Sequence, residues 1–368
     1  MKQIWVQCRK ELAQLRRDRL TVILAFLLPL FYLLIYGFAI RLEIKEIPLV
    51  VQDFDHSPMS RSYVEQLMAT NQFQIVPNNT QQFSPDDAID RNQAKAALVI
   101  APDFERRIKA GKTSNVQVLV DGVDVNNARV IANSIRAATD FFLLRTGLQT
   151  DTRQIAAQIR LWFNPGRKET LFLVPGAYAV ILWVYPSLFT ALAMTREKEQ
   201  GTILQAYASG ISAAELLLGK GLAYLIVAIG QTIFLMLLGA WIFGLRLQGN
   251  PLPLLIGTLI YLINSIFFGL FFGIRSENQG EATQKVLGVG YLTSLLLSGF
   301  IYPLTNLPLL LSVLSNLVPA RYYIDLTRDA FVRGTGWTSV WIVPFLLSSI
   351  GLLLFFGSWQ KLRQMQLE

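Results

Sequence analysis

Long stretches without a charged residue constrain this chain more than any other feature. A helix needs about 20 apolar residues to cross the roughly 30 Å hydrocarbon core of a bilayer. The stretch Leu20–Ile40 is uncharged and lies between Arg19 and Arg41. We therefore predict an α-helical polytopic membrane protein with six transmembrane helices, at Leu20–Ile40, Leu171–Met194, Gly221–Gly244, Leu252–Gly273, Val286–Tyr302 and Ser339–Gly357.

The composition also argues against an all-soluble protein. Hydrophobic residues make up 52% of the 368 residues and charged ones 16%, and the mean hydropathy is +0.40. Water-soluble cores cannot hide this much apolar surface. A net charge of +8 would suit nucleic-acid binding if the basic residues formed a stripe or an arm. Many of them lie instead at the ends of apolar stretches, so we expect a lipid membrane and no nucleic acid as the partner.

The residues that commonly hold metals are scarce. Cys8 is the single cysteine, so the chain can form neither an internal disulfide nor a thiolate metal cluster. The single histidine, His56, follows Asp53 and Asp55, but no second histidine or cysteine completes a coordination set. We expect His56 to be a surface loop residue and the chain to hold no metal or cofactor.

Lysines and arginines near the ends of the spans set the orientation. With both termini in the cytoplasm, most of these residues fall on that side: Lys2, Arg9, Lys10, Arg16, Arg17, Arg19, Arg196, Lys198, Lys220, Arg275, Lys285, Lys361 and Arg363. Gly37–Ala39 also has the small-x-small pattern of a cleaved signal peptide. The apolar stretch before it is too long for such a signal, so we expect an uncleaved first span.

The two ends of the chain are predicted to be cytoplasmic. Residues 1–19 place Ile4, Cys8, Leu12 and Leu15 at three- and four-residue spacing. Such a helix can lie in the membrane interface with its arginines toward lipid phosphates; a basic flank that only sets topology fits equally well. Residues 358–368 form a short tail.

Residues 41–170 have a different pattern, with short apolar runs separated by polar residues. Strands are predicted at PLVVQDFD, FQIVP, AALVIA and VQVLVDG. Helices are predicted at Ser60–Ala69, Pro85–Arg91 and Asp103–Ala110, and a long amphipathic helix follows the last strand and ends at about Leu144. Strands that alternate with helices indicate an α/β domain with a mixed or parallel sheet. With this topology the domain is extracytoplasmic.

Two segments within the five-helix region 171–357 are candidates for function. The charged segment 195–220 lies between two spans, so a partner protein could push on it; a solvated loop is the alternative. The segment 303–333 begins with Pro303, and Pro308 follows. Non-helical backbone inside a membrane is tolerated only against protein or a water-filled cavity. This second segment is therefore a candidate re-entrant gate, or else a packing plug.

No catalytic motif accompanies these segments. The sequence lacks a nucleophile elbow, paired cysteines or histidines, and a phosphate-binding loop. The six stretches also lack the ionisable residue that a proton-driven carrier usually keeps, and hold only mild polar groups such as Gln231, Thr232, Asn264 and Ser265. We therefore expect a transport subunit that is not an enzyme and takes its energy from another chain.

Two short motifs resemble those of ABC type-2 exporter permeases, in the six-span form with a large extracytoplasmic domain after the first span. Residues 196–202, REKEQGT, resemble the family's R-E-x-E-x-G-T loop. The family's outer-loop signature resembles Ser298-Gly299-Phe300, Pro303, Asn306-Leu307-Pro308, Pro319, Arg321-Tyr322 and Asp325. The similarity extends over nearly the whole chain, with the elements in the same order.

The resemblance implies that segment 195–220 contains a coupling helix, expected at about Ser212–Leu218, that sits in a cleft of a separate ATP-binding cassette ATPase subunit. Residues 208–212 lack the proline that the family has where this helix begins. By resemblance the coupling residues are Arg196, Glu197, Glu199, Gly201, Thr202 and Glu215, and those of the outer gate are Gly299, Phe300, Pro303, Asn306, Pro308 and Arg321.

The resemblance also implies a second permease, identical or a sibling, a bacterial inner-membrane location and ATP bound only by the partner subunit. A periplasmic adaptor protein is a further implied partner, and the implied function is efflux of drugs or other amphipathic molecules. Two rival hypotheses remain. One is a membrane-anchored sensor whose outer domain binds a ligand; the other is an ion-driven carrier, which the uncharged spans disfavour.

Overall fold

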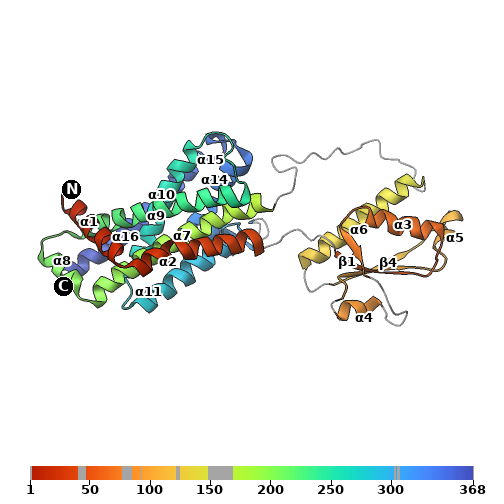
Figure 1. The fold of residues 1–368 in the computed structure, drawn as a ribbon, viewed down its shortest axis with the longest axis horizontal. Helices are drawn as coiled ribbons and strands as arrows, with labels where there is room; N and C mark the ends of the chain where they lie inside the picture. Colours follow the sequence, from red (N-terminus) through yellow and green to blue (C-terminus); the bar gives the residue numbers. More distant parts are fainter. Residues whose placement is uncertain are drawn as a thin grey trace. The chain divides into compact units, whose positions relative to one another are not determined.

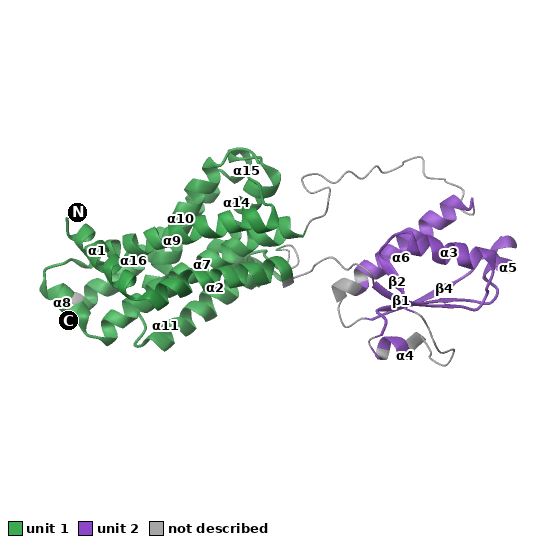
Figure 2. Cartoon of the chain, viewed as in Figure 1, with its two compact units in different colours: residues 1–40, 160–368 green, residues 41–159 purple. Residues whose placement is uncertain are grey.

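The computed structural model describes residues 2–39, 47–76, 85–91, 93–121, 125–147, 169–301, 304 and 307–367. The chain forms two compact units (Figure 2). The helical unit combines Met1–Ile40 with Arg160–Glu368, and the α/β unit is Arg41–Ile159. The outer domain was expected to span residues 41–170, whereas the α/β unit ends at Ile159.

The helical unit begins with α1 (Lys2–Arg17), α2 (Arg19–Leu34) and the π-helix η1 (Ile35–Ala39). Its second part contains α7 (Thr170–Glu199), α8 (Thr202–Ala208), α9 (Ala213–Phe243), α10 (Leu252–Ile274), α11 (Gln279–Lys285), η2 (Val286–Tyr291), α12 (Leu292–Leu296), α13 (Leu309–Ser315), α14 (Pro319–Arg328), η4 (Asp329–Arg333), α15 (Trp337–Val340) and α16 (Val343–Leu367). Both termini, α1 and α8 lie at one end of this unit, and α14 and α15 lie toward the other (Figure 1).

Within the described residues, five helices are long and apolar enough to cross a membrane: Arg19–Phe38, Thr170–Glu199, Ala213–Phe243, Leu252–Ile274 and Val343–Met365. The chain is therefore a multi-pass membrane protein. The expected span at Val286–Tyr302 is not among the five. Its helical part follows directly on α11 as η2 and α12 and ends at Leu296. The expected span at Ser339–Gly357 is found as α16, which starts later and continues through the expected tail.

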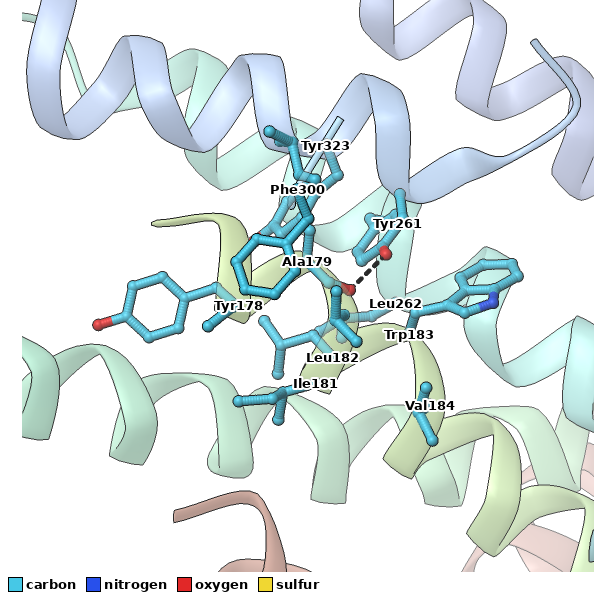
Figure 3. Packing of buried hydrophobic residues seen from close by; sticks show 14 of the residues in the cluster. Tyr178, Ala179, Ile181, Leu182, Trp183, Val184, Tyr261, Leu262, Phe300 and Tyr323 are labelled. Carbon is cyan, nitrogen blue, oxygen red and sulfur yellow. Dashed lines mark hydrogen bonds between the residues drawn. The ribbon is translucent and has the colours of Figure 1, made fainter. Parts of the chain in front are cut away.

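Helix α7 is the centre of the helical unit, and all its residues from Leu173 to Ser187 are buried. Figure 3 shows aromatic residues from three other segments around it. Tyr261 of α10 donates a hydrogen bond to the Ala179 carbonyl at 2.6 Å and stacks on Tyr323 of α14, with ring centroids 4.1 Å apart. Aromatic packing thus fixes α7 against α10 and α14.

The mild polar residues expected inside the spans bind helix backbones. Gln231 of α9 donates to the Ala25 carbonyl at 2.7 Å, and Ser265 of α10 donates to the Trp183 carbonyl at 2.6 Å. Such bonds between helices add to packing in a membrane, where the hydrophobic effect does not hold helices together.

The α/β unit contains a mixed four-stranded sheet in the order β2-β1-β3-β4. The strands are β1 (Ile47–Asp53), β2 (Phe73–Ile75), β3 (Ala96–Ile100) and β4 (Val116–Val120); the helices are α3 (Pro58–Met68), α4 (Pro85–Asp90), α5 (Phe104–Lys109) and α6 (Val125–Arg145). β1 pairs in parallel with β2 and β3, whereas β3 and β4 are antiparallel. Figure 1 shows α3, α5 and α6 on one face of the sheet and α4 on the other.

The strands and helices of the α/β unit follow the sequence pattern closely. Short apolar runs form strands because one or both of their faces are covered by helices. The core under α3 and α6 includes Leu49, Leu98, Tyr63 and Ile135. His56 is exposed, as expected for a surface loop residue, and has a positive φ of 50°. The side of the membrane on which this unit lies stays a prediction.

Candidate functional site

The REKE sequence at the end of α7 binds three neighbouring parts of the helical unit through three of its charged residues. The Arg196 guanidinium lies 3.4 Å from Asp18, at the corner between α1 and α2. Lys198 donates to the carbonyls of Ile274 and Ser276, both at 2.7 Å, and so caps the end of α10. Glu199 accepts hydrogen bonds from the backbone and side chain of Gln279, the first residue of α11.

The fourth charged residue, Glu197, belongs to a buried group of ions. We define the charge cluster as Lys10, Glu11, Glu197 and Lys220. The Lys220 ammonium of α9 is 2.7 Å from a Glu11 oxygen of α1 and 3.2 Å from a Glu197 oxygen of α7. Lys10 binds the other Glu197 oxygen at 2.7 Å. The cluster therefore links α1, α7 and α9.

Burial and charge pairing act in opposite directions on the carboxyl groups of this cluster. The side chain of Lys220 is 1% exposed and that of Glu11 is 3% exposed. Burial raises the pKa of the Glu11 carboxyl from its ordinary value, and the Lys220 ammonium only partly offsets this rise. Gln7 of α1 also donates to Glu11, at 3.1 Å. Two carboxylates and two ammonium groups balance in charge, and the buried Glu11 and Lys220 depend most on their partners.

This geometry corrects the expected position of Lys220. We expected it in the loop just before a span that begins at Gly221. Helix α9 begins instead at Ala213, capped by Ser212, so Lys220 lies inside a helix long enough to span a membrane. Lys220 lies in the first turns of this helix, before the apolar residues that begin at Gly221, and two carboxylates offset its charge.

Helix α1 packs its apolar face on protein. Cys8 is fully buried, and a side chain at Gly219 of α9 would lie 2.7 Å from the Gln7 side chain. The glycine therefore allows close approach of α1 to α9, while Trp5 and Val6 remain exposed. The two expected roles of this segment, an interfacial helix on lipid and a basic flank that only sets topology, both stay predictions.

The short helix α8, within the expected coupling segment, has a free surface. Gly201, at φ 66°, turns the chain after α7 in the left-handed region that favours glycine. The Thr202 hydroxyl donates to the Glu197 carbonyl at 3.2 Å. Tyr207 donates to the Leu362 carbonyl of α16 at 3.2 Å, whereas Leu204 is 67% exposed. One face of α8 is thus anchored and the other is open.

The expected coupling helix at Ser212–Leu218 is helical from Ala213 and continues without a break into α9. Whether it contacts an ATPase stays a prediction. Glu215 accepts hydrogen bonds from the backbone and hydroxyl of Ser212, and Ser212 accepts one from the Glu215 backbone, in a capping box. Ser212-Ala213-Ala214-Glu215 is a capping-box sequence, and it could have revealed both this start and the place of Lys220.

A cavity of about 670 Å³ adjoins the charge cluster. Glu11 and Glu197 contribute to its wall, together with Arg17, Asp18 and Arg196. The Arg196–Asp18 contact lies in the same wall, and hydrogen bonds from Thr21 lower the pKa of the Asp18 carboxyl. Sequence reasoning did not predict this cavity.

Toward α14 and α15, the expected gate residues are packed rather than open. Phe300 is fully buried, and its ring meets Tyr36 edge-on with centroids 5.2 Å apart. Gly299 has a positive φ of 80°, and its carbonyl accepts a hydrogen bond from Arg328 at 3.1 Å. Arg328 also lies 3.8 Å above the Phe172 ring. The sequence singled out Gly299 and Phe300 but missed Arg328.

The remaining gate residues contribute to local geometry. Pro308 occupies the N-cap position of α13. Arg321 of α14 donates to Ser315 at 2.6 Å and to Asn316 at 2.8 Å, which ties α14 to the end of α13. Pro303 and Asn306 lie outside the described residues. Whether this segment opens as a gate stays a prediction.

The described residues contain no group of three or more His, Cys, Asp or Glu side chains that could hold a metal ion. The arrangement is therefore best described by its mechanics: several long apolar helices meet in a charged layer, and a short, partly free helix projects from it. These features define a multi-pass membrane protein whose charged end can receive a partner.

Comparison with known proteins identifies the family. The family described as "ABC-2 family transporter protein" matches residues 19–359. The chain belongs to this family, and it is a permease subunit of an ABC exporter. This membership does not favour the sensor alternative.

Several relatives are similar over most of their length. "Probable multidrug ABC transporter permease YbhS" of Escherichia coli K12 is 26% identical, with 97% of this chain and 96% of the relative covered. YbhR of the same organism, which carries the same description, is also 26% identical, over 95% of this chain and 96% of its own. "Inner membrane transport permease YhhJ" of the same organism is 24% identical, over 84% of this chain and 83% of its own.

Proposed function

We propose that this permease exports drugs or other amphipathic molecules, driven by separate ATP-binding cassette subunits that dock on α8. The printed descriptions of YbhS and YbhR support the substrate class. The observation that carries the docking proposal is the division of α8 into an anchored face and a free one. Ile203 is buried and Tyr207 binds α16, while Leu204 and Gln205 are exposed.

The anchored face gives a route for mechanical coupling. Ile203 packs in an apolar cluster with residues of α7, α9, α10 and α16, including Met194, Leu216 and Ile274. A push on α8 therefore acts on four helices together. ATP can favour one state of the permease only by making different contacts in the two states. In this proposal the free face of α8 makes those contacts.

The charged REKE residues have an indirect part in the proposal. Their side chains bind α1, α9, α11 and the end of α10, so in the proposal they hold the end of α7, from which the chain continues into α8, instead of touching the ATPase. The proposal further includes a second permease, identical or sibling, and an inner membrane with both termini in the cytoplasm. The α/β unit then lies outside, where a periplasmic adaptor could dock.

The test uses the full chain purified with the ATP-binding cassette subunit that co-purifies in mild detergent. Leu204→Arg should abolish co-purification or the stimulation of ATP hydrolysis by an amphipathic dye, because it places a charge on the docking face. Gln364→Arg, an exposed change on α16 at the same end, is the matched control and should have little effect. Equal behaviour of the two variants, at equal folded yield, contradicts docking on α8.

A further inference from the structure

The cavity beside the charge cluster is built in two parts. The larger part, about 670 Å³, lies among α1, α2, α7 and α9 and has a polar wall. A smaller part, about 160 Å³, has a mainly apolar wall that includes Phe26, Ile226 and Val227. Leu15, Thr21, Phe189 and Tyr224 line both parts, so the two adjoin. The larger part alone has the size of a typical small-molecule site.

In the wall of the larger part, the carboxylates have ionic partners, but among the described residues one arginine does not. Each carboxylate in its wall has a cationic partner: Glu11 binds Lys220, Glu197 binds Lys10 and Lys220, and Asp18 binds Arg196. Arg17, also in the wall, is exposed, and the described residues offer it no ion pair. The side chain of Arg196 is 57% exposed, so its contact with Asp18 is weak and exchangeable. The charge left unpaired in this wall is therefore a guanidinium.

We propose that this cavity binds an anionic amphiphile. Arg17 and Arg196 hold its phosphate or carboxylate head, because the planar guanidinium matches these groups with paired hydrogen bonds. Its hydrocarbon chain enters the smaller apolar part between α2 and α9. The arrangement suits the surface of a membrane, since α2 begins at Arg19, beside the cavity. The site stands whether or not the bound molecule is exported.

The first test measures binding of dodecyl phosphate to the purified full chain. Arg17→Gln should weaken binding roughly tenfold, the effect of losing a charged hydrogen bond. Arg16→Gln is the matched control: Arg16 is the neighbouring residue, is also exposed and does not line the cavity. Equal weakening in both variants would indicate general surface attraction and overturn the site. Tighter binding of dodecyltrimethylammonium than of dodecyl phosphate would also overturn it.

The second test concerns the chain-binding part. Gly230 lines the smaller pocket, and a β-carbon there meets only Phe26, at an ordinary 3.9 Å. The β-carbon of Gly230→Val is therefore accommodated, and its γ-carbons should partly fill the pocket; equal folded yield of this variant and the wild type checks the fold. It should weaken dodecyl phosphate binding and leave butyl phosphate binding unchanged. If Gly230→Val weakens neither ligand, or both equally, the proposed path of the chain is wrong.

Two sources of such a molecule are separated by a third measurement. A structural lipid is indicated if phosphatidylglycerol, but not phosphatidylcholine, co-purifies with the wild type and is lost from Arg17→Gln. A transported substrate is indicated if ATP drives dodecyl phosphate into inverted vesicles and Arg17→Gln reduces this uptake. Both results support the site. Binding of dodecyl phosphate without its ATP-dependent uptake also supports the site. The proposal that the ATPase docks on α8 is decided separately, by the Leu204→Arg experiment.

Discussion

The two ends of the helical unit are held together by different chemistry. At the α1 and α8 end, the charge cluster joins three helices through four ionised side chains, of which Lys220 and Glu11 are almost fully buried. At the α14 and α15 end, Phe300 packs against aromatic residues, and Arg328 and Asp329 bind backbone groups. The first end depends on charge balance and the second on shape.

This difference has a consequence for motion. Ionic contacts can be exchanged for others when a partner or a ligand brings its own charges, whereas an interlocked aromatic core has few alternative arrangements. The cavity and the free face of α8 both lie at the ionic end. We therefore expect the ionic end to respond to partners and the aromatic end to respond mainly to changes of side-chain volume.

The largest effect is expected at the ionic end for Lys220→Met. This change leaves the Glu11 carboxylate buried without a cation, and the loss of one partner from a buried pair costs about 3–5 kcal/mol. Thermal unfolding in detergent measures the loss. Lys10→Met is the control, since Lys10 is 39% exposed and should contribute less than about 1 kcal/mol. Adding Glu11→Gln and Glu197→Gln to Lys220→Met should restore most of the stability; no recovery would contradict charge balance.

At the aromatic end, Gly176→Ala should be the next most damaging change. Its β-carbon would lie 2.4 Å from the Phe300 ring, and overpacking of this kind costs about 1–3 kcal/mol. In Phe300→Ala, which removes the ring, the same glycine change should cost much less. A double-mutant cycle of unfolding temperatures measures this coupling. If the effects of Gly176→Ala and Phe300→Ala on the unfolding temperature are additive, side-chain volume does not determine the packing at this end.

Gly201→Ala should have a smaller effect on stability. The φ of 66° at Gly201 is in the left-handed region, where a side chain costs roughly 1–2 kcal/mol. Gly288, in η2, has a free surface and no positive φ, so Gly288→Ala is the control and should be neutral or slightly stabilising. If α8 transmits force, Gly201→Ala should also lower dye-stimulated ATP hydrolysis more than Gly288→Ala does.

The smallest effect is a pH dependence from Glu11. Because burial raises the pKa of this carboxyl above its ordinary value, the folded protein binds its proton more tightly than the unfolded chain. The contribution of Glu11 to stability is therefore lost as pH rises from about 4.5 through the folded pKa. Glu11→Gln should remove this loss, so its unfolding temperature should gain on the wild type as pH rises. A constant difference from pH 4 to 8 would contradict the assignment.

Local sequence patterns predicted most elements of both units. Apolar length located α2, α7, α9, α10 and α16, and alternating runs located the strands of the α/β unit. The expected span at Val286–Tyr302 is not among the five long apolar helices, and its described part is a π-helix followed by a short α-helix. Apolar composition records how well a segment suits lipid, but not where its backbone hydrogen bonds break.

The sequence by itself determined that this chain crosses a membrane, because its uncharged stretches match the bilayer thickness and each helix satisfies its own backbone. It also marked residues 196–202 as unusual. Only the tertiary structure decided what those charges do. Glu11 and Lys220 are 209 positions apart, and no periodicity connects them, so their pairing follows from the packing of α1 on α9. The same packing forms the cavity beside α7 and leaves one face of α8 free.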